Sequence, residues 1–225
     1  MIGLLKQLVL RYQYRGNMAR GMIINRALDF WKHTHVKGDY FEFGVFQGAV
    51  TQYIFRAARL RRMSPFHIYA FDSFKGFGRP TGKDDTTGIL VEGGRACSEE
   101  DFMRGMRAVG AKDNGVTTIP GFFEETLVGA KRDETIHKIG STKAAIVYVD
   151  CDLYEPTRDV LDFITPYLVN GSVLIFDDWF LFKGDPRQGE RCAFEEWAQK
   201  NPQFTFTQFY KFGWHGESFI VNMQA

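Results

Sequence analysis

The fold is decided by the stretch Tyr40-Phe41-Glu42-Phe43-Gly44-Val45-Phe46-Gln47-Gly48. Its apolar first half predicts a buried strand, which ends in a turn at the first glycine. Residues 51–62 follow with apolar side chains at helical spacing. A strand, a glycine turn and a helix in this order begin a βαβ unit, so the stretch predicts a sheet of mostly parallel strands with helices on its faces.

The rest of the chain repeats this alternation. The run at 144–149 is nearly all apolar, which is typical of a strand buried on both faces of a parallel sheet. The last two runs are joined by a connection short enough for a hairpin, so we expect the last strand to be antiparallel. In chain order, the expected strands are 40–45, 66–71, 116–119, 144–149, 172–176, 204–210 and 217–222, and the expected helices are 51–62, 98–109, 157–168 and 192–200.

Composition and charge exclude several classes of protein. The 225 residues are 44% hydrophobic and 24% charged, with a formal net charge of +1. These values exclude a disordered chain, and the balanced charge argues against a nucleic-acid partner. The sequence has no apolar run long enough to span a membrane. Its three cysteines form no Cys-x-x-Cys pair, which predicts reduced thiols and a cytoplasmic location. We expect one domain over residues 1–225.

The N-terminal region, residues 1–37, is predicted to be helical. Its apolar start is interrupted by Lys6 and Gln7, which indicates an amphipathic helix rather than a signal peptide. Such a helix would carry one apolar stripe, formed by Leu4, Leu5, Leu8, Val9 and Tyr12. This stripe either packs on the chain's own domain or forms the interface of a homodimer.

Residues 76–96 contain many Gly, Thr and Asp residues and show no clear periodicity. A connection of this length is usually a functional lid or a disordered insertion. The segment leaves from the edge of the sheet where ligands of such folds bind. We therefore expect a lid over the substrate, with a surface insertion as the alternative. Ser98 and Asp101 then predict a capped helix.

The first glycine turn predicts a nucleoside site. Its pattern, Glu42-x-Gly44-x-x-x-Gly48, lacks one glycine of the dinucleotide fingerprint. Asp72 ends the next strand, where an acid accepts hydrogen bonds from both hydroxyls of a ribose; the alternative is that Asp72 caps a turn. An adenosine site without a pyrophosphate suits S-adenosylmethionine. Aromatic residues available to stack on the adenine are Phe74, Phe122 and Phe123.

Two later strands end in acidic residues. Asp150 and Asp152 follow one strand, and Asp177 and Asp178 follow the next. Carboxylates at neighbouring strand ends repel one another unless a cation lies among them. Oxygen ligands without histidine suit a hard ion such as Mg²⁺ or Ca²⁺. The alternative is that these acids cap helices or are solvated.

Five motifs occur in this order, at residues 42–48, 71–76, 121–127, 150–157 and 177–178. Together they resemble the macrocin O-methyltransferase family, the metal-dependent enzymes that methylate sugar hydroxyls in antibiotic biosynthesis. The resemblance implies a class I methyltransferase fold, a Rossmann-like seven-stranded and mostly parallel sheet with a C-terminal antiparallel hairpin. It further implies S-adenosylmethionine and Mg²⁺ or another hard divalent cation, with a glycosylated small molecule as substrate.

The resemblance also assigns roles to residues. Asp152 would be the general base, and Asp150, Asp177 and Asp178 would hold the metal. The expected cofactor contacts are Glu42, Gly44, Gly48, Asp72 and Ser73, to which we add Phe46 and Phe122.

Three other functions remain open. Asp150-x-Asp152 is also the metal motif of glycosyltransferases that use nucleotide sugars, but such an enzyme leaves the glycine turn and Asp72 without a role. An NAD-dependent enzyme would need the missing glycine. A protein of this fold that only binds a partner has no need of the intact acids.

Overall fold

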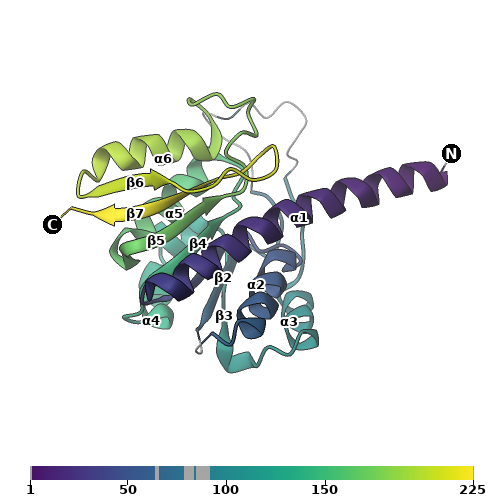
Figure 1. Ribbon diagram of the computed structural model, residues 1–225, viewed down its shortest axis with the longest axis horizontal. Coiled ribbons are helices and arrows are strands. Elements are labelled where there is room, and N and C mark those ends of the chain that lie inside the picture. The colour runs from purple at the N-terminus through teal and green to yellow at the C-terminus, as the bar shows by residue number, and fades with distance from the viewer. Residues whose placement is uncertain (1, 64–65, 79–83, 85–91, 225) are drawn as a thin grey trace.

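The computed structural model describes residues 2–63, 66–78, 84 and 92–224, and the side chains of residues 2–17 are not described. Its described strands form one seven-stranded sheet in the order β3-β2-β1-β4-β5-β7-β6 (Figure 1). Strands β3, β2, β1, β4 and β5 are parallel, whereas β7 is antiparallel to both β5 and β6. The strands are β1 Asp39–Phe43, β2 Ile68–Asp72, β3 Val116–Pro120, β4 Ala144–Val149, β5 Leu168–Phe176, β6 Phe204–Gln208 and β7 Glu217–Met223.

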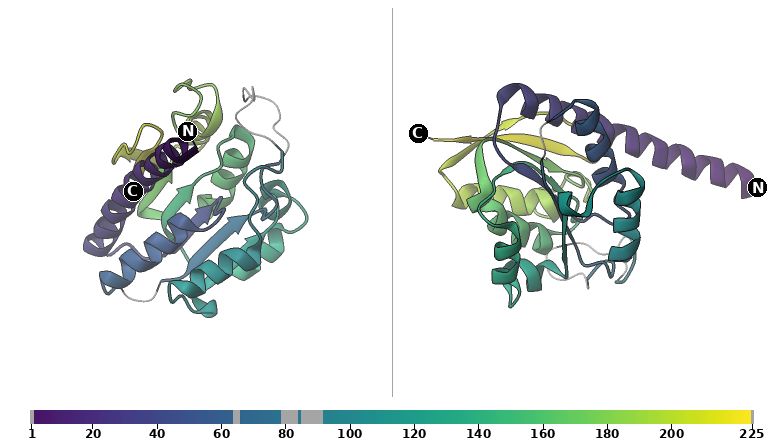
Figure 2. Two further views of the ribbon diagram at one scale, coloured as in Figure 1. Left: turned by 90° about the vertical axis from the view of Figure 1, so that its right-hand side faces the viewer. Right: turned by 90° about the horizontal axis from the view of Figure 1, so that it is seen from below.

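Helices cover both faces of the sheet (Figure 2). On one face, α1 (Ile2–Thr34), α2 (Ala49–Leu60) and α3 (Glu99–Ala108) enclose one core; on the other, α4 (Arg132–Ile139), α5 (Tyr154–Ile164) and α6 (Gly189–Lys200) enclose a second. Successive residues of a strand point to opposite faces, so Tyr40 belongs to the first core and Phe41 to the second. The N-terminal part of α1 extends beyond the sheet (Figure 1).

The predicted sheet is confirmed, and so is its antiparallel C-terminal hairpin. The helix expected at 157–168 instead begins at Tyr154 and ends at Ile164. Its first turn starts earlier because the Tyr154 N–H donates to the carboxylate of Asp84, 2.7 Å away, which caps the helix from a distant segment. The chain then forms a short 3₁₀ turn around Pro166, and the next strand begins at Leu168.

The π-helical turn Glu124–Val128 and α4 are not indicated by any pattern in the sequence. Of the residues predicted as a lid, 79–83 and 85–91 lie outside the described residues. The two ends of that segment pair with each other, since the Phe77 N–H donates to Gly94 and the Gly93 N–H to Phe77. Among the described helices, none combines the length and the apolar character needed to cross a bilayer. Cys97, Cys151 and Cys192 are free thiols.

Candidate active site

The glycine-rich turn after β1 brings the ends of two strands together. Gly44 has a φ of 87°, and a Cβ atom there would lie 2.0 Å from the carbonyl oxygen of Asp150, at the end of β4. Only glycine fits such an approach. Gly48 has a φ of 74° and lies against the ring of Phe102 in α3, so it also allows close packing. The turn therefore places the predicted nucleoside site beside the acids that follow β4.

Asp72, the last residue of β2, holds this turn in place. One carboxylate oxygen accepts the N–H groups of Val45 and Phe46, each at 2.9 Å, and the other accepts the N–H of Phe74 at 2.7 Å. Asp72 thus caps its own turn, which was the alternative interpretation, and also fixes the glycine-rich turn. Its contact with a ribose stays a prediction.

The other predicted cofactor residues lie around the same edge. Glu42 is buried and accepts a hydrogen bond from the Tyr40 hydroxyl at 2.7 Å, and burial raises the pKa of its carboxyl to about 8. Ser73 donates to the carbonyl of Gly76 at 2.7 Å. Phe46 is 38% exposed in the turn, and Phe122 follows β3. Their contacts with a cofactor also stay predictions.

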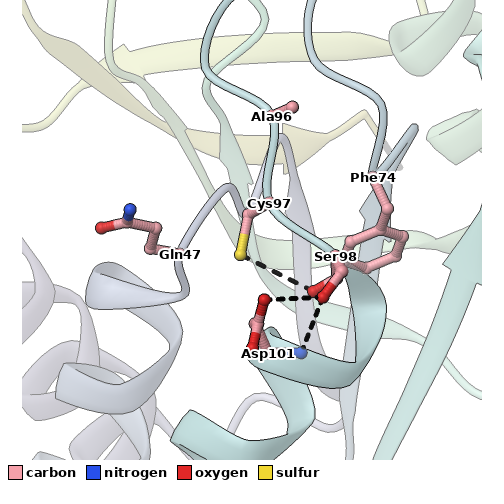
Figure 3. Close-up of a pocket in the computed structure, with 6 residues that line it drawn as sticks. All are labelled: Gln47, Phe74, Ala96, Cys97, Ser98 and Asp101. Carbon is pink, nitrogen blue, oxygen red and sulfur yellow. Dashed lines mark hydrogen bonds between the residues drawn. The ribbon is translucent and has the colours of Figure 1, made fainter.

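A cavity of about 390 Å³ opens beside the turn (Figure 3). It is lined by Gln47 of the turn, Phe74 after β2, and four residues at the start of α3, namely Ala96, Cys97, Ser98 and Asp101. Ser98 caps α3 as predicted, because its hydroxyl accepts the Asp101 N–H at 3.1 Å. The volume lies within the range of small-molecule sites, about 300–1,000 Å³. The sequence-based analysis missed the contribution of α3, since its capping residues indicated only a helix start.

The predicted acids meet at the ends of β4 and β5. Asp150, Asp152 and Asp178 place one carboxylate oxygen each within 4.8 Å of the others. Loss of water around them and repulsion among them raise the pKa of Asp150 and Asp178 well above the usual value, and burial raises the pKa of Asp152 to about 6. A hard divalent cation among these oxygens would offset the repulsion. The donor set therefore fits the expected ion.

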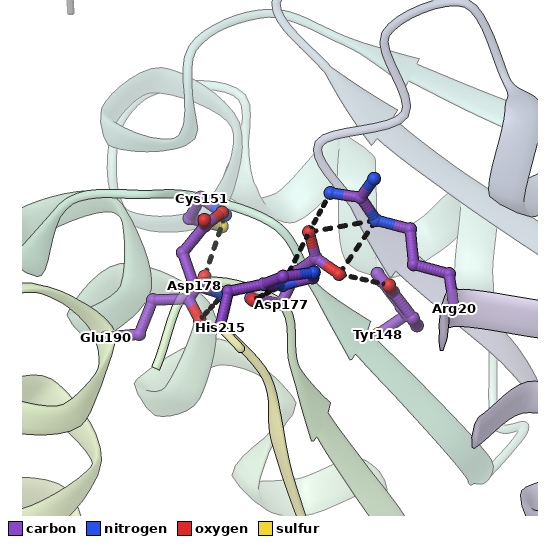
Figure 4. A network of polar contacts seen from close by, with 7 residues as sticks. All are labelled: Arg20, Tyr148, Cys151, Asp177, Asp178, Glu190 and His215. Atoms are coloured by element: carbon purple, nitrogen blue, oxygen red, sulfur yellow. Dashed lines mark hydrogen bonds and ion pairs between the residues drawn. The ribbon is translucent and has the colours of Figure 1, made fainter. Parts of the chain in front are cut away.

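Asp177 is held differently from its neighbours (Figure 4). Its buried carboxylate accepts from the Arg20 guanidinium, whose Nε lies 2.9 and 3.0 Å from the two oxygens, and from the Tyr148 hydroxyl at 2.5 Å. Its backbone carbonyl accepts from Nδ1 of His215 at 2.5 Å. Asp177, Asp178 and His215 form a second group with ligand atoms within 4.8 Å of one another. The structure thus gathers all four predicted acids, but it pairs the Asp177 side chain with α1.

Two groups of this site, the half-buried Arg20 and the buried Glu190, are not indicated by any pattern in the sequence. Arg20 comes from α1, and Glu190 is the second residue of α6. Glu190 accepts the Cys151 N–H at 3.0 Å and the Asp178 N–H at 2.9 Å. Neither residue belongs to a motif in the sequence. The one signal for Glu190 is its place as an acid in the first turn of α6. Such an acid usually indicates a favourable interaction with the helix dipole rather than a role in a site.

The strand order, the glycine-rich turn after β1 and the acids after β4 and β5 define the class of the fold as that of class I O-methyltransferases. The family model of macrocin O-methyltransferase (TylF) matches residues 18–199. The chain belongs to this family, and the predicted resemblance is confirmed.

Relatives with a described activity are O-methyltransferases. A Streptomyces olivaceus protein, 8-demethyl-8-(2,3-dimethoxy-alpha-L-rhamnosyl)-tetracenomycin-C 4'-O-methyltransferase, is 30% identical over 149 residues, which are 64% of this chain and 54% of that protein. A Streptomyces niveus protein, demethyldecarbamoylnovobiocin O-methyltransferase, is 29% identical over 153 residues, 65% of this chain and 55% of that protein. The matched part spans about half the length of these relatives.

A solved structure has the same fold. Calicheamicin methyltransferase CalS11 superposes with a TM-score of 0.67 at 23% identity, covering 96% of this chain and 84% of that one.

Proposed function

We propose that the chain is an O-methyltransferase that moves the methyl group of S-adenosylmethionine to a hydroxyl of a sugar or a sugar-bearing natural product, with the help of Mg²⁺. The observation that carries the proposal is the contact between Gly44 and Asp150, which joins the glycine-rich turn to the acidic cluster. Family membership supports methyl transfer, and the names of the relatives support a glycosylated acceptor.

The cofactor is proposed to bind at the ends of β1 and β2. Its contacts would be the predicted set of Glu42, Gly44, Phe46, Gly48, Asp72, Ser73 and Phe122. The cavity beside Gln47 and Phe74 supports this position, because it opens at the same turn. Asp72 would act there in two ways, since it both orients the backbone of the turn and offers remaining lone pairs to a ribose.

The acidic cluster is proposed to hold the cation and the acceptor. Asp150, Asp177 and Asp178 would be the ligands, and when bound such an ion lowers the pKa of a hydroxyl and fixes its position. Asp152 would accept the proton of that hydroxyl. Its pKa of about 6 supports this role, because a base works best when its pKa lies near the working pH. The geometry also supports a second assignment of the ligands. In it, Asp152 is the third metal ligand beside Asp150 and Asp178, and Asp177 is only the partner of Arg20.

A methyl-transfer assay tests the proposal. The whole chain is incubated with S-adenosylmethionine labelled in the methyl group and with a panel of glycosides and nucleotide sugars, with Mg²⁺ or with EDTA. We expect label to enter at least one acceptor with Mg²⁺, and the transfer to fall sharply with EDTA. Transfer of the sugar instead of the methyl group would replace the proposal with the glycosyltransferase interpretation.

A further inference from the structure

Glu190 joins the two segments that carry the acidic cluster. Its side chain is fully buried, and its two oxygens accept from two different segments, Oε1 from the Cys151 N–H and Oε2 from the Asp178 N–H (Figure 4). Cys151 lies between Asp150 and Asp152 after β4, and Asp178 lies after β5. One carboxylate therefore spans the gap between the two groups of predicted site residues.

This bridge begins where the sheet ends. Strands β4 and β5 are paired up to Val149 and Phe176, and the next backbone bond runs from the Asp177 N–H to the Val149 carbonyl at 2.9 Å. The two N–H groups that Glu190 accepts lie just past this bond. Within the sheet, backbone hydrogen bonds connect β4 to β5. Beyond the ends of these strands, the Glu190 carboxylate connects the two segments instead, by accepting one N–H from each.

The start of α6 is built to bring Glu190 to this position. Gly189 has a φ of 59°, and a Cβ there would lie 2.7 Å from the ring of Phe182 and 3.3 Å from the carbonyl oxygen of Asp152. Its N–H donates to the carboxylate of Asp84 at 2.8 Å. Glycine at this position therefore lets the helix approach the acidic segment closely, and Asp84 fixes its first turn.

A buried carboxylate close to four other acids, of which Asp152 and Asp177 are also buried, is unfavourable unless its hydrogen bonds compensate for it. Each oxygen of Glu190 accepts a backbone N–H, and among the described residues Glu190 belongs to neither group whose ligand atoms lie within 4.8 Å of one another, so its role differs from that of a ligand. We propose that Glu190 is a positioning residue, which fixes the separation between Asp150 and Asp178 and thereby sets the affinity of the site for a divalent cation. This inference rests on the proposed function.

Two substitutions test the bridge, with Mn²⁺ as the probe in a calorimetric titration of the whole chain. Glu190→Gln keeps the size of the side chain but turns an NH₂ group toward one of the two N–H donors. Glu190→Asp keeps the charge but is too short to reach both. We expect both variants to bind Mn²⁺ about 10–100-fold more weakly, the usual effect of losing a partner that orients metal ligands.

The matched control is Glu195→Gln, the same change on a partly exposed residue of α6 that pairs with Arg191. It should bind Mn²⁺ like the parent protein. All variants should bind S-adenosylhomocysteine with the parent affinity, which shows that they are folded. In the transfer assay, excess Mg²⁺ should restore most of the activity of both Glu190 variants.

Parent-like Mn²⁺ binding by Glu190→Asp, together with weak binding by Glu190→Gln, would overturn the bridge, because the charge alone would then matter. Loss of S-adenosylhomocysteine binding in both variants would overturn it too, since Glu190 would then support the whole fold. Failure of the parent protein to bind Mn²⁺ would contradict the proposed metal site instead.

Discussion

Asp152 combines three properties expected of a proton acceptor at the site. Its side chain is buried, its pKa is raised to about 6, and its backbone lies in the left-handed region with a φ of 59°. Residues other than glycine adopt that region rarely, and often at functional sites. This conformation turns the chain from β4 toward α5, while a carboxylate oxygen of Asp152 stays within 4.8 Å of those of Asp150 and Asp178.

Substitution separates the roles of these two acids. Asp152→Asn should lower the rate of methyl transfer by roughly 10²–10⁴-fold, the range for a positioned base, and extra Mg²⁺ should not restore it. Asp150→Asn should lower the affinity for the metal, so extra Mg²⁺ should restore part of its activity. Steady-state rates over a series of Mg²⁺ concentrations measure both. Equal rescue of the two variants would make Asp152 a ligand.

Arg20 pairs with a carboxylate that has no exposure to solvent. Arg20→Met leaves Asp177 buried without its cationic partner. Removing one partner of a fully buried ion pair costs about 3–5 kcal/mol; because the Arg20 side chain is 30% exposed, we expect a smaller loss, about 2 kcal/mol. Urea unfolding measures it. The double variant Arg20→Met with Asp177→Asn should lose less than the sum of the two single losses, and simple additivity would argue against a coupled pair.

Glu42 predicts a pH dependence of stability. Burial raises the pKa of its carboxyl from 4.5 to about 8, so between these values the unfolded chain releases a proton that the folded protein retains. The contribution of Glu42 is therefore fully present below pH 4.5 and is lost as the pH rises toward 8. Glu42→Gln remains neutral, so its stability relative to the parent should rise from pH 5 to pH 8 in urea titrations. A difference that does not change with pH would contradict this assignment.

At the scale of elements, the turn after β1 depends on a close approach to β4. Gly44→Ala would place a methyl group against the Asp150 carbonyl, in addition to the strain of a positive φ. Gly140 provides the matched control: its φ is 69°, and a Cβ there would meet nothing within 4 Å. Gly140→Ala should therefore cost only the strain of its backbone, with φ 69° and ψ −145°, about 1–3 kcal/mol. Gly44→Ala should lower the free energy of unfolding, measured in urea, by clearly more. An equal loss in the two variants would show that the close approach to Asp150 adds no cost.

The sequence predicted elements best where the pattern is local. The strand expected at 144–149 has those bounds in the structure, because nearly every residue is apolar and all six are buried. The start of α5 was misplaced, because its cap is Asp84, which lies far away in the chain. The four acids were correctly expected at one edge, since parallel strands bring their carboxyl ends together. Arg20 and Glu190 could not be found in this way, because only the packing of α1 and α6 brings them to that edge.

For the whole molecule, the role of α1 is the main expectation still open. From Ile23 to Trp31 the helix packs on the sheet, while its N-terminal part extends beyond it (Figure 1). The predicted apolar stripe, Leu4 to Tyr12, lies where side chains are not described, so both alternatives for it stay predictions. Met18 and Met22 are exposed on this helix and line a hollow of about 580 Å³ with Tyr53 of α2. A homodimer through the N-terminal helix therefore stays a proposal. The same helix carries Arg20 into the site, so a dimer formed through this helix would share one element with the acidic cluster.

The central claim is that a nucleoside cofactor and a cation have separate places at one edge of the sheet. Calorimetric titration of the whole chain with S-adenosylhomocysteine, in EDTA and again in Mg²⁺, tests it most directly. We expect one-to-one binding with similar affinity in both buffers, and weaker binding in Asp72→Ala, which would lose the proposed ribose acceptor and the support of the turn. No binding of S-adenosylhomocysteine in either buffer, with binding of a nucleotide sugar or of NAD instead, would contradict it.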